Sequence, residues 1–463
     1  MSNSTSLFVA PFTVILRRDD LILLQNQFNT GLLALSRHEW EALSKLPRQA
    51  SVVYCENELI ASLGNKFAKK LVSRMSEAGF MLDPARLVGR FSSKGQEGEQ
   101  KKIQISGFPT KDRPLGLQRA LNSYSASFRQ WGHRPTLKIV DFSERAHNCE
   151  ANRSSATVAA KTFDLEVRYI DKTCISSLAS AISNAAGVDT RIVRFVLGLD
   201  ASATSSACYR EFSTYGATRN ALLLTCPNQL LMTADDDTYC GSWPTYQPTC
   251  AIYASPDEEP FVWGRIEEVG QCERGLYDCL SSHQLLLGKR LPDILNQSAT
   301  HSCYPPVLLN NLNSRVSRTF LGVKGASGLR SPLTSLLYRL KRQSLTRPVS
   351  GYYRNATRTR NLDRWISHPT VCRSGFCMGI NMALDNRVGL PPFFPFQRNE
   401  DGIFGLLCGV MPDACIAGFS PGMIHHSPLE QRSLSNREMW KQALEWRTPD
   451  YVLQLLFFVV KSW

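Results

Sequence analysis

Three consecutive aspartates, Asp235, Asp236 and Asp237, end a short apolar stretch of the chain. The apolar residues predict a buried strand over residues 229–233. Carboxylates this close together repel one another, so a positive charge must offset them. Aspartate oxygens suit Mg²⁺ or Mn²⁺, and open α/β sheets collect their ligands at the carboxyl ends of strands. The triplet therefore predicts a divalent-metal site at a sheet edge, and a solvated acidic turn is the alternative.

Strand and helix signals alternate from residue 135 onward, which is the pattern of an α/β layered domain. Strands are expected over residues 137–141 and 165–170, and helices over residues 175–186 and 217–224. The chain has 463 residues, of which 43% are hydrophobic and 20% are charged. This composition is that of a globular protein and excludes a disordered or collagen-like chain.

Residues 1–87 are expected to form a separate small domain. Strands are predicted over residues 8–16 and 21–24, followed by a helix whose N-cap is Ser36 and by further helices. Strands followed by helices favour a winged-helix-like module. Residues 88–134 are interpreted as a polar linker and a short helix, because the glycine- and charge-rich start of this stretch cannot bury enough surface to fold alone.

The positive charge of the chain is concentrated in one segment. The formal net charge is +13, and residues 311–370 contain twelve basic residues and one acidic residue, which is a net +11. Leucines within residues 331–347 share one helical face beside basic residues, which suits an anionic membrane surface or an acidic acceptor. A solvated helix face is the alternative, and single-stranded nucleic acid is the least favoured partner.

The fourteen cysteines are scattered, and no Cys-x-x-Cys pair occurs among them. This spacing does not fit a zinc site, so buried thiols in a reducing compartment are expected. The apolar stretch at residues 7–16 lacks the preceding basic residues of a signal peptide, and no apolar run reaches the length of a membrane span. We therefore predict a cytoplasmic protein.

The residues around the triplet resemble a known enzyme family. Gly216-Ala217-Thr218-Arg219-Asn220 begins a helix that leads into the Asp-bearing strand, residues 136–143 are similar to a nucleotide-binding strand, and residues 390–405 are similar to an acidic acceptor-side motif. In their order along the chain, these segments resemble nucleotide-sugar-dependent glycosyltransferases of the GT-A type, family 2-like members in particular. The resemblance spans about residues 136–430. It implies a Rossmann-like, nucleotide-binding sheet flanked by helices.

The resemblance also implies roles for individual residues. The donor would be a nucleotide-diphosphate sugar, and the metal would be Mn²⁺ or Mg²⁺. Residues implied in binding the donor are Asp141, Arg219, Asn220, Asp235 and Arg398. Residues implied in holding the metal are Asp235 and Asp237, with His425 or His426 as a further ligand.

The acceptor side follows from the same resemblance. Asp401, or Glu400 beside it, would be the general base of an inverting transfer. Residues 135–310 would be the nucleotide-sugar-binding half of the domain and residues 311–463 the acceptor-side half. The long basic stretch between the triplet and Pro391 departs from the family pattern, so neither the sugar nor the acceptor is specified.

The N-terminal module has a resemblance of its own. Residues 20–31, followed by the helix that starts after Ser36, are similar to the recognition domain of peptide-modifying enzymes, which adds a leader peptide to a sheet edge. This favours a peptide acceptor. The alternative function is a non-catalytic peptide-binding protein with a degenerate glycosyltransferase domain.

A serine-hydrolase interpretation fails on chemical grounds. Gly418-Phe419-Ser420-Pro421-Gly422 matches the Gly-x-Ser-x-Gly elbow. That elbow uses the backbone N–H after the serine in its oxyanion hole. Pro421 has no N–H to donate.

Overall fold

The computed structural model describes residues 8–9, 12–26, 31–46, 52–82, 102–199, 214–241, 252–254, 260–264, 277–291, 293–294, 314–325, 363–366, 368–396, 399–409, 411, 416–426, 435–444, 451–452 and 455–456. The contacts between residues divide the chain into two compact units. The first comprises residues 1–99, 251–257 and 289–314, and the second comprises residues 100–250, 258–288 and 315–463.

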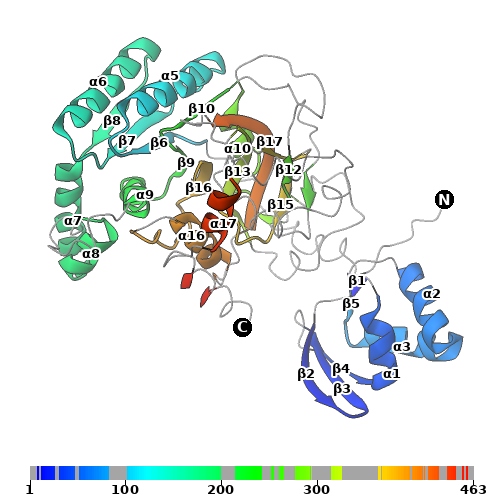
Figure 1. Ribbon diagram of the computed structural model, residues 1–463. Coiled ribbons are helices and arrows are strands. Elements are labelled where there is room, and N and C mark those ends of the chain that lie inside the picture. The colour runs from blue at the N-terminus through cyan, green and yellow to red at the C-terminus, as the bar shows by residue number, and fades with distance from the viewer. Residues whose placement is uncertain are drawn as a thin grey trace. The chain divides into compact units, whose positions relative to one another are not determined.

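The first unit begins with antiparallel strands and continues with helices (Figure 1). Its strands are β1 (Phe8–Val9), β2 (Phe12–Arg18), β3 (Leu21–Asn26), β4 (Leu32–Ser36), β5 (Met81–Leu82) and β11 (Tyr253–Ala254). Its helices are α1 (Arg37–Ser44), α2 (Val52–Leu63) and α3 (Asn65–Glu77). Strand β3 pairs with both β2 and β4, and β1 pairs with β5.

The predicted N-cap of the first helix is confirmed. The Ser36 hydroxyl accepts a hydrogen bond from the Glu39 amide at 3.2 Å, and the Glu39 carboxylate accepts one from the Ser36 amide at 2.8 Å. This reciprocal capping box satisfies two amides that the helix itself leaves without partners. Leu24, Leu35 and Leu71 join the strands and helices in one buried core.

The second unit is built on one large mixed sheet with helices packed against it, which confirms an α/β fold. Its strands are β6 (Ile105–Thr110), β7 (Thr136–Asp141), β8 (Val167–Ile170), β9 (Leu230–Ala234), β10 (Thr238–Tyr239), β12 (Val262–Gly264), β13 (Val316–Gly325), β14 (Asp363–Trp365), β15 (Thr370–Cys372), β16 (Asn381–Asp385) and β17 (Ile416–His426). The strand order includes the run β8-β7-β6-β9-β16-β13-β17-β15. Strands β8, β7, β6 and β9 are parallel, and β16 is antiparallel to both β9 and β13.

The helices of the second unit supply the layers on both faces of this sheet. They are α5 (Pro114–Gln130), α6 (Ala146–Phe163), α7 (Lys172–Ala186), α8 (Thr190–Val196), α9 (Tyr215–Leu224), α10 (Cys279–Gln284), α16 (Glu400–Gly409) and α17 (Asn436–Leu444). Helices α5 and α6 lie side by side (Figure 1). Helix α9 packs on β6 and β7.

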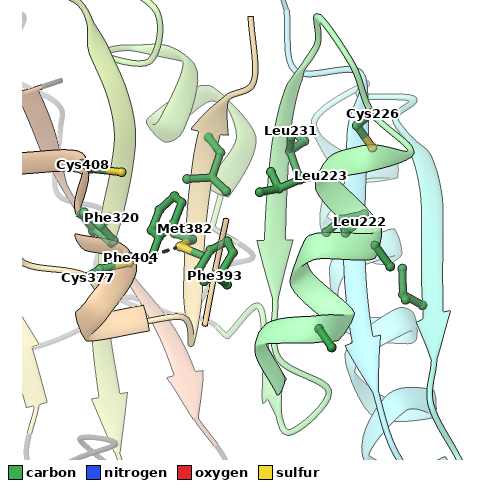
Figure 2. Packing of buried hydrophobic residues seen from close by; sticks show 14 of the residues in the cluster. Leu222, Leu223, Cys226, Leu231, Phe320, Cys377, Met382, Phe393, Phe404 and Cys408 are labelled. Atoms are coloured by element: carbon green, nitrogen blue, oxygen red, sulfur yellow. Dashed lines mark hydrogen bonds between the residues drawn. The ribbon is translucent and has the colours of Figure 1, made fainter. Parts of the chain in front are cut away.

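Side chains that alternate along the strands divide the interior into two cores. Phe108 of β6 and Met232 of β9 face the core that α5 and α6 complete. Ile105 and Leu231 of the same strands face the core that contains α7, α9 and α16. Figure 2 shows this second core, in which Phe393 stacks on Phe404 with ring centroids 3.9 Å apart. The sheet is therefore covered on both faces.

The linker predicted within residues 88–134 is wrong in part, because residues 105–110 form β6, which lies between β7 and β9 in the sheet. The short helix predicted in the same stretch is found as α5, residues 114–130. The polar residues before position 102 dominated the composition of the stretch. The apolar residues Ile103, Ile105 and Phe108 that follow are all buried. They give the strand its place in the interior.

The basic segment, residues 311–370, lies partly outside the described residues, including the helix predicted over residues 331–347. Two of its arginines that are described, Arg318 of β13 and Arg364 of β14, are fully buried. The Arg364 guanidinium lies over the ring of Phe261 at 5.0 Å. These two charges belong to the interior and cannot meet an anionic surface. Within the part of the chain that the structure describes, no helix is long and apolar enough to cross a membrane.

Candidate functional site

The carboxyl ends of three parallel strands meet at one edge of the sheet. Thr110 ends β6 opposite Asp141, which ends β7, and Asp235 directly follows β9 on the other side of β6. The chain passes outward from β6 through β7 to β8 and then returns to the opposite side of β6 as β9. In open α/β sheets, ligands bind at such a reversal, in the crevice outside the carboxyl ends of the strands. The predicted triplet lies at this position.

The triplet forms a tight turn that is anchored at its first residue. The Asp235 amide donates to the Ile380 carbonyl at 3.0 Å. The Asp235 carbonyl accepts hydrogen bonds from the Thr238 amide at 3.1 Å and from its hydroxyl at 2.7 Å. The turn gives the three carboxylates different surroundings. The side chains of Asp235 and Asp237 are 31% and 22% exposed, whereas that of Asp236 is 6% exposed.

Asp236 is held inside the protein. Its carboxylate accepts a hydrogen bond from the Thr110 hydroxyl at 2.7 Å and one from Arg113 at 3.2 Å. Burial raises the pKa of Asp236 to about 7, against the opposing effect of Arg113. Asp236 therefore faces β6, while the carboxylates on either side of it are the accessible ones.

Arg113 bridges two members of the triplet. Its Nη1 lies 3.2 Å from Asp236 Oδ1 and 2.9 Å from Asp237 Oδ2. Although burial acts against its charge, the two carboxylates raise the pKa of Arg113 above its ordinary value. The first turn of α5 packs directly on the triplet, since a Cβ on Gly116 would lie 2.8 Å from the Asp236 carbonyl oxygen. Arg113 thus supplies part of the positive charge that the triplet was predicted to need.

Arg219 connects the triplet to the predicted catalytic acids. Its side chain is only 5% exposed, and its Nη2 donates to Asp235 Oδ1 at 2.6 Å and to the Gly379 carbonyl at 3.0 Å. Its Nε lies 3.6 Å from Glu400 Oε1. Burial and the charge of Asp237 raise the pKa of Asp235, while the charge of Arg219 acts to lower it. One buried guanidinium therefore brings Asp235 and Glu400 together.

Glu400 and Asp401 occupy the first turn of α16 but differ in environment. Glu400 is buried, and burial together with the Asp401 charge raises its pKa to about 8. Asp401 is partly exposed, and its two oxygens accept hydrogen bonds from the amides of Gly379 and Gly402, each at 2.8 Å. Gly379 thus binds Asp401 through its amide and Arg219 through its carbonyl. The predicted acids and the triplet share one site.

Asn220 and Gly216 attach the acceptor-side segment to α9. The Asn220 amide group both donates to the Phe393 carbonyl, at 2.9 Å, and accepts from the Phe393 amide, at 2.8 Å. A Cβ on Gly216 would lie 1.8 Å from the Phe394 carbonyl oxygen and 3.2 Å from the Glu400 Cβ. The glycine therefore permits a close approach that no other residue allows. The donor-binding role predicted for Arg219 and Asn220 stays a prediction, since their observed partners are protein groups.

Asp141 lies at the crevice but is buried and engaged. Its Oδ1 accepts from the Ser143 amide at 2.7 Å, and its Oδ2 accepts from Asn152 at 2.9 Å and from the Tyr169 hydroxyl. A nucleotide would have to displace one of these bonds to reach the carboxylate. The predicted contact between Asp141 and a nucleotide stays a prediction.

The sequence did not predict a role for three residues at or just after the end of β6: Thr110, Asp112 and Arg113. Asp112 accepts from the amides of Glu144 and Arg145, each at 3.2 Å, and so caps the N-terminus of α6. A local signal for this stretch did exist, because Pro114 stands at the first position of α5, where proline is favoured.

The remaining predicted residues are described only in part. The backbones of His425 and His426 pair with Tyr239 and Thr238, directly after the triplet, but their side chains are not among those described. Arg398 lies outside the described residues. The backbone register therefore brings the histidine pair next to the triplet, as the metal-ligand role requires, and the role itself stays a prediction.

A series of buried hydrogen bonds leads to the turn that the triplet forms. His283 lies between the Thr319 hydroxyl and the Asn381 side-chain oxygen, each at 2.7 Å, and the Asn381 amide donates to the Tyr124 hydroxyl at 3.1 Å. Tyr124 contacts the Thr238 hydroxyl at 3.2 Å, which in turn donates to Asp235. Burial lowers the pKa of His283 to about 4, so the imidazole is neutral near pH 7. Each group in this series can donate one hydrogen bond to the next group, in the direction from Thr319 to Asp235.

Among the side chains that the structure describes, no group of three His, Cys, Asp or Glu residues is arranged to hold a metal ion. The accessible carboxylates Asp235 and Asp237 nevertheless offer the hard oxygen atoms that Mg²⁺ and Mn²⁺ prefer. No protein-family model matches the chain, and no curated protein shows significant similarity to it.

Replacing Gly216 with alanine is expected to destabilise the second unit by about 1–3 kcal/mol, because the Cβ would collide with the Phe394 carbonyl. Gly389→Ala is the matched control, since nothing lies within 4 Å of a Cβ there, and its effect should stay within about 0.5 kcal/mol. Urea unfolding followed by tryptophan fluorescence measures both. Equal stability of the two variants would contradict the described packing.

Glu400→Gln is expected to gain stability relative to the wild type as the pH rises. The pKa of Glu400 in the folded protein is about 8, above its ordinary value of 4.5. The free energy of unfolding of the wild type is therefore unaffected by this group below pH 4.5 and falls as the pH rises from 4.5 to 8. The difference should grow by no more than about 1.4 kcal/mol per pH unit. Unfolding free energies from pH 5 to 8 test this. Glu144→Gln, which removes an exposed carboxylate with a lowered pKa, should give a constant difference over the same range.

His283→Leu should cost about 2–5 kcal/mol, because it leaves the Thr319 hydroxyl and the Asn381 oxygen buried without their partner. His283→Gln can still donate and accept, so it should cost less. Denaturant unfolding of both variants near pH 7 is the measurement. If leucine were tolerated as well as glutamine, the hydrogen-bond chain would contribute nothing to stability.

Proposed function

We propose that this protein is a metal-dependent glycosyltransferase of the GT-A type, which moves a sugar from a nucleotide-diphosphate donor to an acceptor. The observation that carries the proposal is the joining of two distant acidic motifs at one sheet edge. Arg219 contacts Asp235 of the triplet and Glu400 of α16 at once. A metal-binding donor site beside a carboxylate base suits metal-dependent, inverting sugar transfer.

Donor binding is assigned to the crevice at the ends of β6, β7 and β9. Asp235 and Asp237, the partly exposed carboxylates of the triplet, would hold Mn²⁺ or Mg²⁺. The bound ion would neutralise the diphosphate and stabilise its negative charge as the sugar leaves. Asp236 stays buried against Thr110 and fixes the turn. The capped N-terminus of α6 is already occupied by Asp112, so the diphosphate is not assigned there.

Of the two acids in α16, Asp401 is proposed as the general base. It is partly exposed and can reach an acceptor, whereas Glu400 is buried behind it. The amides of Gly379 and Gly402 hold its carboxylate in a fixed orientation. It would take the proton from the acceptor nucleophile as that atom attacks the anomeric carbon from the side opposite the diphosphate, which inverts the configuration. Glu400 is proposed to position Arg219 and, through it, Asp235.

The acceptor is proposed to be a peptide. The first unit presents a three-stranded antiparallel sheet whose outer strands are β2 and β4, beside three helices. An edge strand can bind an extended peptide by adding it to the sheet. The alternative function, a non-catalytic peptide-binding protein, is favoured by the engagement of Asp237 with Arg113, since a site that holds no metal would need such an internal cation.

Calorimetric titration of UDP and of GDP in the presence of Mn²⁺ tests the donor site. The wild type should bind one of them, and Asp235→Ala/Asp237→Ala should bind it at least about tenfold more weakly or lose Mn²⁺ dependence. Equal metal-dependent binding by both proteins would refute the assignment. Release of nucleotide from a panel of nucleotide sugars separates the two functions, because turnover that Asp401→Asn abolishes excludes the non-catalytic alternative.

A further inference from the structure

Arg113 occupies a carboxylate that the proposed metal ion also needs. Its Nη1 lies 2.9 Å from Asp237 Oδ2, and its side chain is 34% exposed. Arg219, in contrast, is 5% exposed and lies within the core. A guanidinium and a divalent cation on the same carboxylate repel each other strongly at this distance. Arg113, which can turn toward solvent without opening the core, is the one that can give way.

We propose that Arg113 is the resident counter-ion of the triplet, which a divalent cation displaces from Asp237 and which then binds a phosphate-bearing ligand. The proposal depends on the proposed function for the identity of the metal site. It makes Arg113 a binding residue whose two partners alternate: a carboxylate before the metal binds, and a phosphate oxygen afterwards. Arginine suits both, because its planar fork matches carboxylate and phosphate groups.

The geometry provides for a short movement. Nη1 of Arg113 contacts Asp236 as well as Asp237, so loss of Asp237 leaves one anchor in place. Asp236 is itself fixed by the Thr110 hydroxyl at 2.7 Å and by the packing of Gly116 on its carbonyl. Arg113 would therefore move only a short distance and would stay beside the ends of β6 and β9.

A second feature concerns the other guanidinium of the site, that of Arg219. Nε and Nη1 of Arg219 are buried and donate no hydrogen bond, although Nη2 donates to Asp235. Buried donors nearly always have a partner. Because Nε faces Glu400 Oε1 at 3.6 Å, Nη1 is the donor for which the complete site would need a further oxygen atom. Water bound to a hydrated cation, or a ligand oxygen, would supply it.

Opposite effects on two ligands follow from this role. Removing Arg113 removes a competitor of the cation, so the cation should bind more tightly. The same change removes a contact of the anion, so a phosphate-bearing ligand should bind more weakly. In the wild type each ligand should raise the affinity for the other by the same factor, since coupling free energies are reciprocal.

The test uses the full chain and Mn²⁺ alone, with free Mn²⁺ followed by electron paramagnetic resonance. Arg113→Gln should bind Mn²⁺ about tenfold more tightly than the wild type, and Arg113→Lys, which keeps the charge, should stay near the wild type. Arg119→Gln, an exposed arginine on the same helix, is the control for loss of one charge and should change the affinity less than about twofold. Circular dichroism verifies that each variant is folded.

Equal or weaker Mn²⁺ binding by Arg113→Gln, or no Mn²⁺ binding by either protein, would overturn the proposal. Binding of radiolabelled inorganic pyrophosphate at saturating Mn²⁺, measured by equilibrium dialysis, is the second arm. It should weaken about tenfold in Arg113→Gln, and unchanged binding would also overturn the proposal. If both arms give the expected results but UDP and GDP do not bind, the proposed function fails while the role of Arg113 stands.

Discussion

One buried guanidinium, that of Arg219, holds together the parts of the site that lie far apart in the sequence. Its Nη2 binds Asp235 at the end of β9, and its Nε faces Glu400 at the start of α16. A buried charge of this kind is strongly destabilising when it loses a partner, because the remaining ion is left without compensation. The positions of β9, α9 and α16 are thus interdependent.

The charge balance of the site follows from this arrangement. Burial raises the pKa values of Asp236, to about 7, and of Glu400, to about 8, so protons as well as arginines reduce the repulsion among the acids. Asp235, Asp237 and Asp401 are partly exposed to solvent. The acids that a cation or a substrate can reach are therefore distinct from the two buried ones.

The sequence predicted those features whose signal is local. The apolar run before Asp235 gave β9 to within one residue, and the Ser36 N-cap gave the start of α1. Strand β6 was not predicted, because the polar stretch before it dominates the composition of that part of the chain. Its place beside β9 is a tertiary feature without a local signal. The partners of Arg219 and Asp141 could not be predicted, because they include Gly379 before β16 and residues of α16, α6 and β8, which meet only when the sheet is assembled. Local patterns therefore located the acids, while tertiary packing decided which of them are exposed.

A crystal structure with Mn²⁺ and UDP bound would test the central claim most directly, namely that the crevice beside β9 is a donor site. We expect Mn²⁺ on the carboxylates of Asp235 and Asp237, with the diphosphate beside it and Arg113 turned away from Asp237. The Arg219 contacts with Asp235 and Glu400 should be retained. Nucleotide bound elsewhere on the protein, or a triplet that still binds only Arg113 and Arg219 at saturating Mn²⁺, would contradict the account.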